Sequence, residues 1–296
     1  MARYSLKNTQ ISIEVDSLGA ELKSLKKITT GTEYMWDANP EYWKRTSPVL
    51  FPIVGSLNNG SYKYEGKAYP MSQHGFARDM EFALLQQTED ALTFVLRSTD
   101  ETKAKYPFDF ELELGYRLIG NSVILSWRVT NRGNKEMHFS IGGHPAFLCP
   151  INNRGVQTEY KLLFNTCAGE KPTKITSGII GDGGTLSERT KAFLLKDGMM
   201  EITADLFDED ALIIEHDQAH SVALCDREGQ PYLTVRFDAP LFGIWSPAKK
   251  NAPFICIEPW YGRCDRESFQ GSLSEREWGN TLAAGEEFYA EYTVVI

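Results

Sequence analysis

Apolar and polar residues alternate one by one along much of this chain, which is the pattern of a β-strand that buries one face. Between residues 108 and 118 every even position holds Phe, Leu or Tyr, while most odd positions are charged. After a turn at Gly120-Asn121 the alternation resumes, with Val, Leu and Trp at the odd positions of residues 123–129. We predict that these two segments form one long antiparallel hairpin with one buried face.

Further strands are predicted where short runs rich in β-branched and aromatic residues are bounded by turn signals, such as those at residues 58–60 and 227–229. A helical period is almost absent, and only residues 41–45 and 101–106 are expected to form single helical turns. The pattern predicts an all-β fold, an antiparallel sandwich or barrel of many strands. The additional strands are expected at residues 10–15, 91–97, 211–216, 221–225, 232–237 and 288–296.

The organisation of the chain indicates one domain. Its 296 residues are 42% hydrophobic and 24% charged, an ordinary globular composition that can bury a large core. No repeat, low-complexity segment or Pro/Gly/Ser linker divides the chain, so we predict a single domain over residues 1–296. Residues 165–189 are rich in Gly and Thr and are expected to form a long surface excursion.

Charge and cysteine content narrow the class of protein. The net charge is -9 and no block of Lys and Arg occurs, which argues against binding to nucleic acid or to an anionic membrane. No apolar run approaches the ~20 residues that span a bilayer, and the N-terminus lacks the apolar core of a signal peptide. The five cysteines include no C-x-x-C pair, so we expect reduced thiols and a cytoplasmic protein.

The chain carries no standard nucleotide or metal signature. It lacks a phosphate loop, a dinucleotide fingerprint, a G-x-S-x-G elbow and an H-E-x-x-H motif. Two histidines, His74 and His144, stand beside glycines in loop-like settings, where a ligand can approach closely. They are candidate functional residues. The other three histidines are interpreted as ordinary turn or core residues: His138, His216 and His220.

Glu258 is the carboxylate with the most distinctive surroundings. It ends the apolar run of residues 254–258 and is followed by two aromatic residues, of which Trp260 offers a flat platform for the apolar face of a sugar. Partial desolvation raises the pKa of such a carboxyl and makes it a better base. The alternative is a structural Glu258 that pairs with Arg263 or Arg266.

Taken together, several segments resemble the aldose 1-epimerase (galactose mutarotase-like) family. The closest likeness is to its LacX-like branch, in which Gly-His-Pro precedes a Phe and a Cys-Pro, here Cys149-Pro150. The resemblance implies a large twisted antiparallel β-sandwich, the galactose mutarotase-like supersandwich. In chain order the matching segments are Arg45, His-Gly-Phe-Ala-Arg at residues 74–78, Gly-His-Pro-Ala-Phe at residues 143–147, Asp210, and Ile-Cys-Ile-Glu-Pro-Trp at residues 255–260.

The resemblance also implies roles for individual residues. Glu258 matches the general base of the family and His144 matches the general acid. The remaining matches bind or line the sugar: His74 hydrogen-bonds it, Arg45 lines the site, and Asp210 binds hydroxyls, with Asp208 as a rival because the match there is short.

The implied reaction is mutarotation of a free aldohexose such as galactose or glucose. A base removes the proton of the anomeric hydroxyl and an acid protonates the ring oxygen, so that the ring opens and closes to either anomer. One base and one acid suffice, each worth ~10²–10⁴-fold. No metal, cofactor or covalent nucleophile is needed, and the expected partner is a small sugar bound by a monomer or homodimer.

Three other functions stay open on the sequence alone. Arg45 and Arg78 could clamp a phosphate, as in a hexose-6-phosphate 1-epimerase, although the net charge of -9 gives no attraction for an anion. A non-catalytic carbohydrate-binding sandwich would not need both Glu258 and His144. A glycoside hydrolase would use Asp210 and Glu258 as its carboxylate pair. We favour the neutral aldose.

Overall fold

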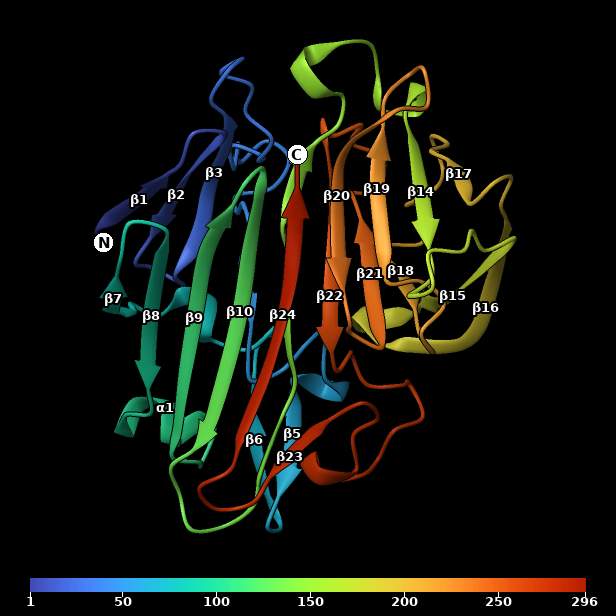
Figure 1. Cartoon of the computed structure of the whole chain (residues 1–296). Coiled ribbons are helices and arrows are strands. Elements are labelled where there is room, and N and C mark those ends of the chain that lie inside the picture. Colours follow the sequence, from blue (N-terminus) through green and yellow to red (C-terminus); the bar gives the residue numbers. More distant parts are fainter.

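The computed structural model describes residues 1–296 and consists mainly of antiparallel strands, which confirms the predicted all-β class. A nine-stranded sheet runs through the whole molecule, and Figure 1 shows its long strands side by side. Its strands, in spatial order, are β17 (Met199–Glu201), β14 (Lys161–Asn165), β19 (Ser221–Cys225), β20 (Pro231–Phe237), β24 (Glu287–Val295), β10 (Ser122–Asn131), β9 (Phe110–Ile119), β8 (Ala91–Arg97) and β7 (Ala83–Gln87).

A second large sheet has eight strands and supplies most of the site described below. In spatial order it contains β16 (Leu186–Leu194), β15 (Lys174–Ile180), β18 (Leu212–Ile214), β21 (Leu241–Trp245), β22 (Phe254–Tyr261), β12 (Ile141–Gly143) and β4 (Val49–Leu50), and β13 (Ala146–Leu148) also pairs with β22.

Smaller elements flank the two large sheets. None of the helices has the length and apolar character needed to cross a membrane. The small sheets are β1 (Arg3–Lys7) with β2 (Ile11–Asp16) and β3 (Glu21–Lys27), β5 (Ser61–Tyr64) with β6 (Lys67–Pro70), and β11 (Met137–Phe139) with β23 (Asn280–Leu282). The helices are α1 (Asp100–Lys105) and the 3₁₀ turns η1 (Asn58–Gly60), η2 (Ala77–Asp79), η3 (Ile151–Asn153), η4 (Gln157–Glu159), η5 (Asp182–Gly184) and η6 (Leu273–Glu275).

The predicted hairpin is β9 and β10, which pair antiparallel along their whole length. Trp127 lies opposite Leu114, and both side chains are buried, as the alternation requires. The other predicted strands correspond to β2, β8, β18, β19, β20 and β24, and the predicted helical turn at residues 101–106 is α1.

Two local expectations are wrong. Residues 41–45 do not form a helical turn of their own: a single turn starts earlier, where the Asn39 carbonyl accepts the N–H groups of Tyr42 and Trp43, and no further backbone hydrogen bond continues it. Residues 165–189 contain β15 and the start of β16, an edge hairpin of the eight-stranded sheet. Its alternation is interrupted at Gly178, where the register shifts by a bulge.

One face of β22 packs against the main hydrophobic core, and the other face is left to line the site. One cluster of 66 buried residues joins Leu112 and Trp127 of the nine-stranded sheet to Ile255 and Ile257 of β22. Successive residues of a strand point to opposite faces. The alternate residues of β22 therefore face away from that core: Phe254, Cys256, Glu258 and Trp260.

Candidate active site

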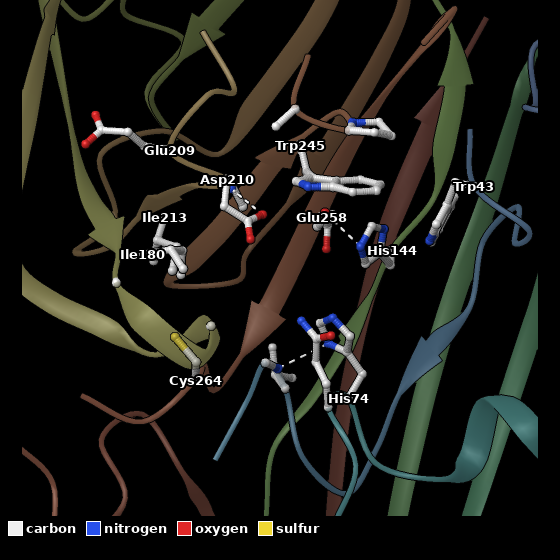
Figure 2. A pocket seen from close by; sticks show the side chains of 18 of the residues that line it. Trp43, His74, His144, Ile180, Glu209, Asp210, Ile213, Trp245, Glu258 and Cys264 are labelled. Carbon is white, nitrogen blue, oxygen red and sulfur yellow. Dashed lines mark hydrogen bonds and ion pairs between the residues drawn. The ribbon is translucent and has the colours of Figure 1, made fainter. Parts of the chain in front are cut away.

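A cavity of about 750 Å³ lies on this outer face of the eight-stranded sheet. Side chains from segments far apart in the sequence line it, and Figure 2 shows Glu258 between Asp210 and His144, with His74 facing His144. The structure thus brings together six of the sequence-predicted site residues: His74, Arg78, His144, Asp210, Glu258 and Trp260.

Glu258 and His144 form the centre of the site. Glu258 is on β22, and His144 is at the corner between β12 and β13. The distance from His144 Nε2 to Glu258 Oε1 is 3.3 Å, and the Glu258 side chain is 1% exposed. Glu258 Oε2 and His144 Nδ1 have no hydrogen-bond partner in the protein. The pair is therefore desolvated but keeps two polar atoms free.

Gly142 is what allows this corner to pack against β22. A Cβ atom at Gly142 would lie 2.5 Å from Trp260 Cδ1 and 3.1 Å from the Pro259 carbonyl oxygen. Because real Cβ atoms do not approach other atoms so closely, any larger residue would push β12 away from β22 and His144 away from Glu258. Gly142, one of the two glycines that precede His144, thus lets the backbone of β12 pack directly on the Trp260 side chain.

Burial disfavours charge on both groups of the pair. It raises the pKa of Glu258 well above the usual carboxyl value, and the nearby Asp210 carboxylate adds to the shift. It also lowers the pKa of His144, with further contributions from the Arg78 and Arg45 charges. The two groups are in contact and titrate as a unit, and burial favours the state in which they share one proton and the pair has no net charge.

His74 presents a neutral imidazole to the same cavity. The backbone N–H of Gly55 donates to His74 Nδ1 over 3.1 Å, so the ring proton is on Nε2 and can be donated to a ligand. Burial lowers the pKa of His74, which keeps it neutral. Its ring lies edge-on to that of His144, with centroids 5.6 Å apart. Gly75 has φ +72° in close contact with the Phe51 carbonyl, which explains the glycine after this histidine.

Sequence reasoning missed two aromatic residues that enclose His144. Trp43 stacks on the imidazole with ring centroids 4.7 Å apart, and Trp245 meets it edge-on at 5.5 Å. Both indoles line the cavity, and Figure 2 shows Trp43 beside His144. The only signal for them was their position, one beside Arg45 and the other at the end of an apolar run. Trp260 is buried under Gly142 and Gly243 and forms part of the cavity wall.

An acidic segment before β18 closes the opposite side of the cavity. Asp208, Glu209 and Asp210 all line it, although the run reads as a solvated turn in the sequence. The charge of Asp210 contributes to the raised pKa of Glu258, whereas Glu209 pairs with Arg189 over 3.2 Å. Of the three acids in this run, Asp210 is therefore the one whose charge acts on the pKa of Glu258.

The two arginines differ in their access to the cavity. Arg78 lines it and donates to the Gln73 carbonyl over 2.6 Å, while its Nε is buried without a hydrogen-bond partner. Arg45 does not line the cavity directly, and its guanidinium is held by Asp79 at 2.8 Å. Its charge still reaches both active-site histidines and lowers their pKa values.

Several alternatives for individual residues are removed by the structure. Arg263 binds Glu215 and Glu277, and Arg266 also binds Glu277, so neither neutralises Glu258. The other three histidines lie outside the cavity: His138 bonds Thr281, His216 packs on Trp278 and His220 contacts Asp217.

One group of side chains in the site could hold a metal ion. The Cys256 thiol lies on the same face of β22 as Glu258. Together with His144, these two residues place one possible ligand atom each within 4.8 Å of the others.

Comparison with known proteins agrees with this geometry. The family model for aldose 1-epimerase matches residues 2–292. The chain is 36% identical to the plasmid-encoded protein LacX of Lactococcus lactis subsp. lactis over 267 residues, 87% of each chain. A galactose mutarotase related enzyme from Lactobacillus acidophilus has a crystal structure with 34% identity and a TM-score of 0.91, covering 99% of this chain and 97% of that one.

A galactose mutarotase-like protein from Lactobacillus casei is similar over its full length, with 28% identity, a TM-score of 0.91 and coverage of 99% of both chains. The galactose mutarotase-like fold implied by the sequence is thereby confirmed, as is the likeness to LacX. The match to the family model extends over nearly all residues, including both members of the buried pair. The chain therefore belongs to the aldose 1-epimerase family.

Proposed function

We propose that this protein is an aldose 1-epimerase that interconverts the α and β anomers of a free aldohexose such as galactose or glucose. The observation that carries the proposal is the desolvated contact of Glu258 with His144, which opens on a cavity of a size usual for small ligands. A sugar-binding module without catalysis has no need of a buried acid/base pair. Family membership supports the same type of activity.

The pair can supply both proton transfers of the reaction. Moving the shared proton across the 3.3 Å contact converts a neutral Glu258–His144 pair into a carboxylate and an imidazolium with no change in net charge. Carboxylate Glu258 then takes the proton of the anomeric hydroxyl, and imidazolium His144 protonates the ring oxygen. The C1–O5 bond breaks to give the open-chain aldehyde. Closure on the other face reverses both transfers.

The other cavity groups are suited to holding a polyol. His74 offers an Nε2–H donor, and the Asp210 carboxylate accepts hydrogen bonds from sugar hydroxyls. The indoles of Trp43 and Trp245 exclude water around His144, which strengthens electrostatic interactions within the site. We assign these residues to substrate binding and to maintaining a dry pocket.

The charge of the cavity supports a neutral substrate. Arg189 is paired with Glu209, and the Lys250 ammonium is directed at backbone carbonyls, so Arg78 is the cation best placed to receive a ligand. A phosphate would also face the repulsion of a predominantly acidic wall. The carboxylates that line the cavity are those of Asp182, Asp208, Glu209, Asp210 and Glu258, and the cations are Arg78, Arg189 and Lys250.

A hexose-6-phosphate 1-epimerase is the second candidate, and one observation favours it. Arg78 Nε is buried without a hydrogen-bond partner, and its ion pair with Asp79 Oδ2 is long at 3.8 Å, so the guanidinium keeps donor capacity for a second anion. Burial and the neighbouring Arg45 charge also lower the pKa of Arg78 to about 10, although Asp79, whose Oδ2 lies 3.8 Å from Arg78 Nε, opposes this shift.

Anomer exchange measured by NMR tests the proposal directly. Freshly dissolved α-galactose, α-glucose and their 6-phosphates are each followed to equilibrium with and without the protein. We expect acceleration for at least one free aldose, with no release of reducing sugar from glycosides. No acceleration with any of the four sugars contradicts the proposal, and acceleration of the phosphates alone selects the second candidate.

A further inference from the structure

The mechanism above gives no role to the buried thiol that is near the Glu258–His144 pair. Cys256 is two residues before Glu258 on the same face of β22, and its side chain is fully buried. One ligand-type atom from each of His144, Cys256 and Glu258 lies within 4.8 Å of the other two. Proton transfer to and from a sugar uses the imidazole and the carboxylate but not a thiol.

The spacing of these atoms is close to that of a tetrahedral zinc site. With Zn–N and Zn–O bonds of about 2.0–2.1 Å and a Zn–S bond of about 2.3 Å, tetrahedral geometry places the nitrogen and oxygen about 3.4 Å apart and the sulfur about 3.6 Å from each. His144 Nε2 and Glu258 Oε1 are 3.3 Å apart. The separations involving sulfur are within 4.8 Å, so the sulfur lies at most about 1.2 Å farther from either partner atom than in a tetrahedral site.

The chemistry of the three groups suits the same ion. A thiolate and a carboxylate balance the charge of a divalent cation, and sulfur with imidazole favours Zn²⁺ over Mg²⁺ or Ca²⁺. Glu258 Oε2 and His144 Nδ1 are buried without hydrogen-bond partners. His144 and Glu258 also line the cavity, which gives an ion a path to the site and leaves its fourth position open to water.

We propose that His144, Cys256 and Glu258 form a binding site for Zn²⁺ at the floor of the cavity, and that the bound ion inhibits the protein. As the S–Zn bond forms, the thiol proton and the proton shared by the Glu258–His144 pair leave to solvent. The ion then occupies both groups that transfer protons to the sugar. Binding of the ion rests on the spacing and ligand chemistry of these three residues, and only the inhibition rests on the proposed function.

Cobalt spectroscopy and zinc calorimetry test the site on the full-length protein freed of metal with EDTA. Co²⁺ should bind with a 1:1 stoichiometry and give the near-ultraviolet sulfur-to-cobalt charge-transfer band that marks thiolate ligation. Cys256→Ser should lose the band and weaken Zn²⁺ binding by more than ~10-fold, since it removes a ligand. Cys167→Ser, which changes an exposed thiol, should keep both and is the matched control.

Inhibition is measured as the Zn²⁺ dependence of anomer exchange, normalised to the metal-free rate of each variant. Wild type and Cys167→Ser should be inhibited and recover with EDTA, whereas Cys256→Ser should resist. The site is refuted if wild type gives no thiolate band with Co²⁺, or if Cys256→Ser keeps wild-type zinc affinity. If Cys256→Ser does not fold, the wild-type spectrum decides. A thiolate band in a protein without epimerase activity would sustain the site and refute the proposed function.

Discussion

Replacing Glu258 by Gln is the most direct perturbation of the proposed chemistry. Gln has nearly the same shape as Glu, and its amide can still donate to His144 Nε2 across the present 3.3 Å contact. What the variant loses is the ability to accept and release a proton. We expect the turnover of anomer exchange to fall while the cavity and the fold are retained.

The magnitude follows from the isolation of this carboxyl group. A positioned acid or base contributes about 10²–10⁴-fold, which corresponds to about 2.7–5.4 kcal/mol of activation free energy. Glu258 is 1% exposed, so water has poor access as a substitute base. Asp210 makes no hydrogen bond to Glu258 and influences it through its charge. We therefore expect a loss in the upper half of that range.

Stability provides the control for correct folding, and its pH dependence has a definite sign. Desolvation, with a smaller contribution from Asp210, raises the pKa of Glu258 in the folded protein above its value in the unfolded chain. The folded state then holds a proton that the unfolded state releases above about pH 4.3, so wild type loses stability as the pH rises from there toward the raised pKa. Glu258→Gln lacks this loss and should be more stable than wild type at neutral pH, with the difference vanishing near about pH 4.

Exchange spectroscopy on equilibrated glucose and galactose measures the turnover, and urea unfolding at several pH values measures the stability. A variant that unfolds like wild type or better, but exchanges anomers at least ~10²-fold more slowly, agrees with the argument. Near wild-type turnover in a folded Glu258→Gln protein would refute the assignment of Glu258 as a proton-transfer residue.

The remaining predictions concern the other cavity residues. His144→Asn should lower turnover by about 10²-fold or more and abolish one limb of a bell-shaped pH profile, whereas His216→Asn, outside the cavity, should not. Asp210→Asn should lower kcat/KM by about 10–100-fold through loss of a charged hydrogen bond worth about 1.5–3 kcal/mol, and an equal effect of Asp208→Asn would contradict the choice of Asp210. Arg78→Ala should leave free-aldose exchange nearly unchanged, and a strong preference for a 6-phosphate that disappears in this variant would show that the substrate is phosphorylated.

Local pattern was sufficient for most of the strands. The β9–β10 hairpin and β24 were predictable because a strand with one buried face must alternate apolar and polar residues, whatever lies opposite. The pattern failed at β15, where Gly178 and a bulge interrupt the alternation, and at residues 41–45, where the hydrogen-bonded turn that starts at Asn39 is not continued.

The candidate site was only partly accessible from the sequence. His74, His144 and Glu258 stood out because glycines or a strand end mark positions where backbone and ligand approach closely, and because the segments resemble a known family. Trp43 carried no such mark: an aromatic residue beside a turn looks the same whether it packs in a core or stacks on an imidazole.

Only the tertiary structure determines the charge state of Glu258 and the ion-pair partner of Arg45. The charge state of Glu258 depends on burial, on its contact with His144 and on the distance to Asp210, and these come from separate segments that the sheet brings together. Likewise, Arg45 is kept out of the cavity wall by Asp79, a partner contributed by another turn. A sequence specifies which groups can ionise, but their pKa values and partners depend on desolvation and distance, which exist only after strands distant in the chain have packed.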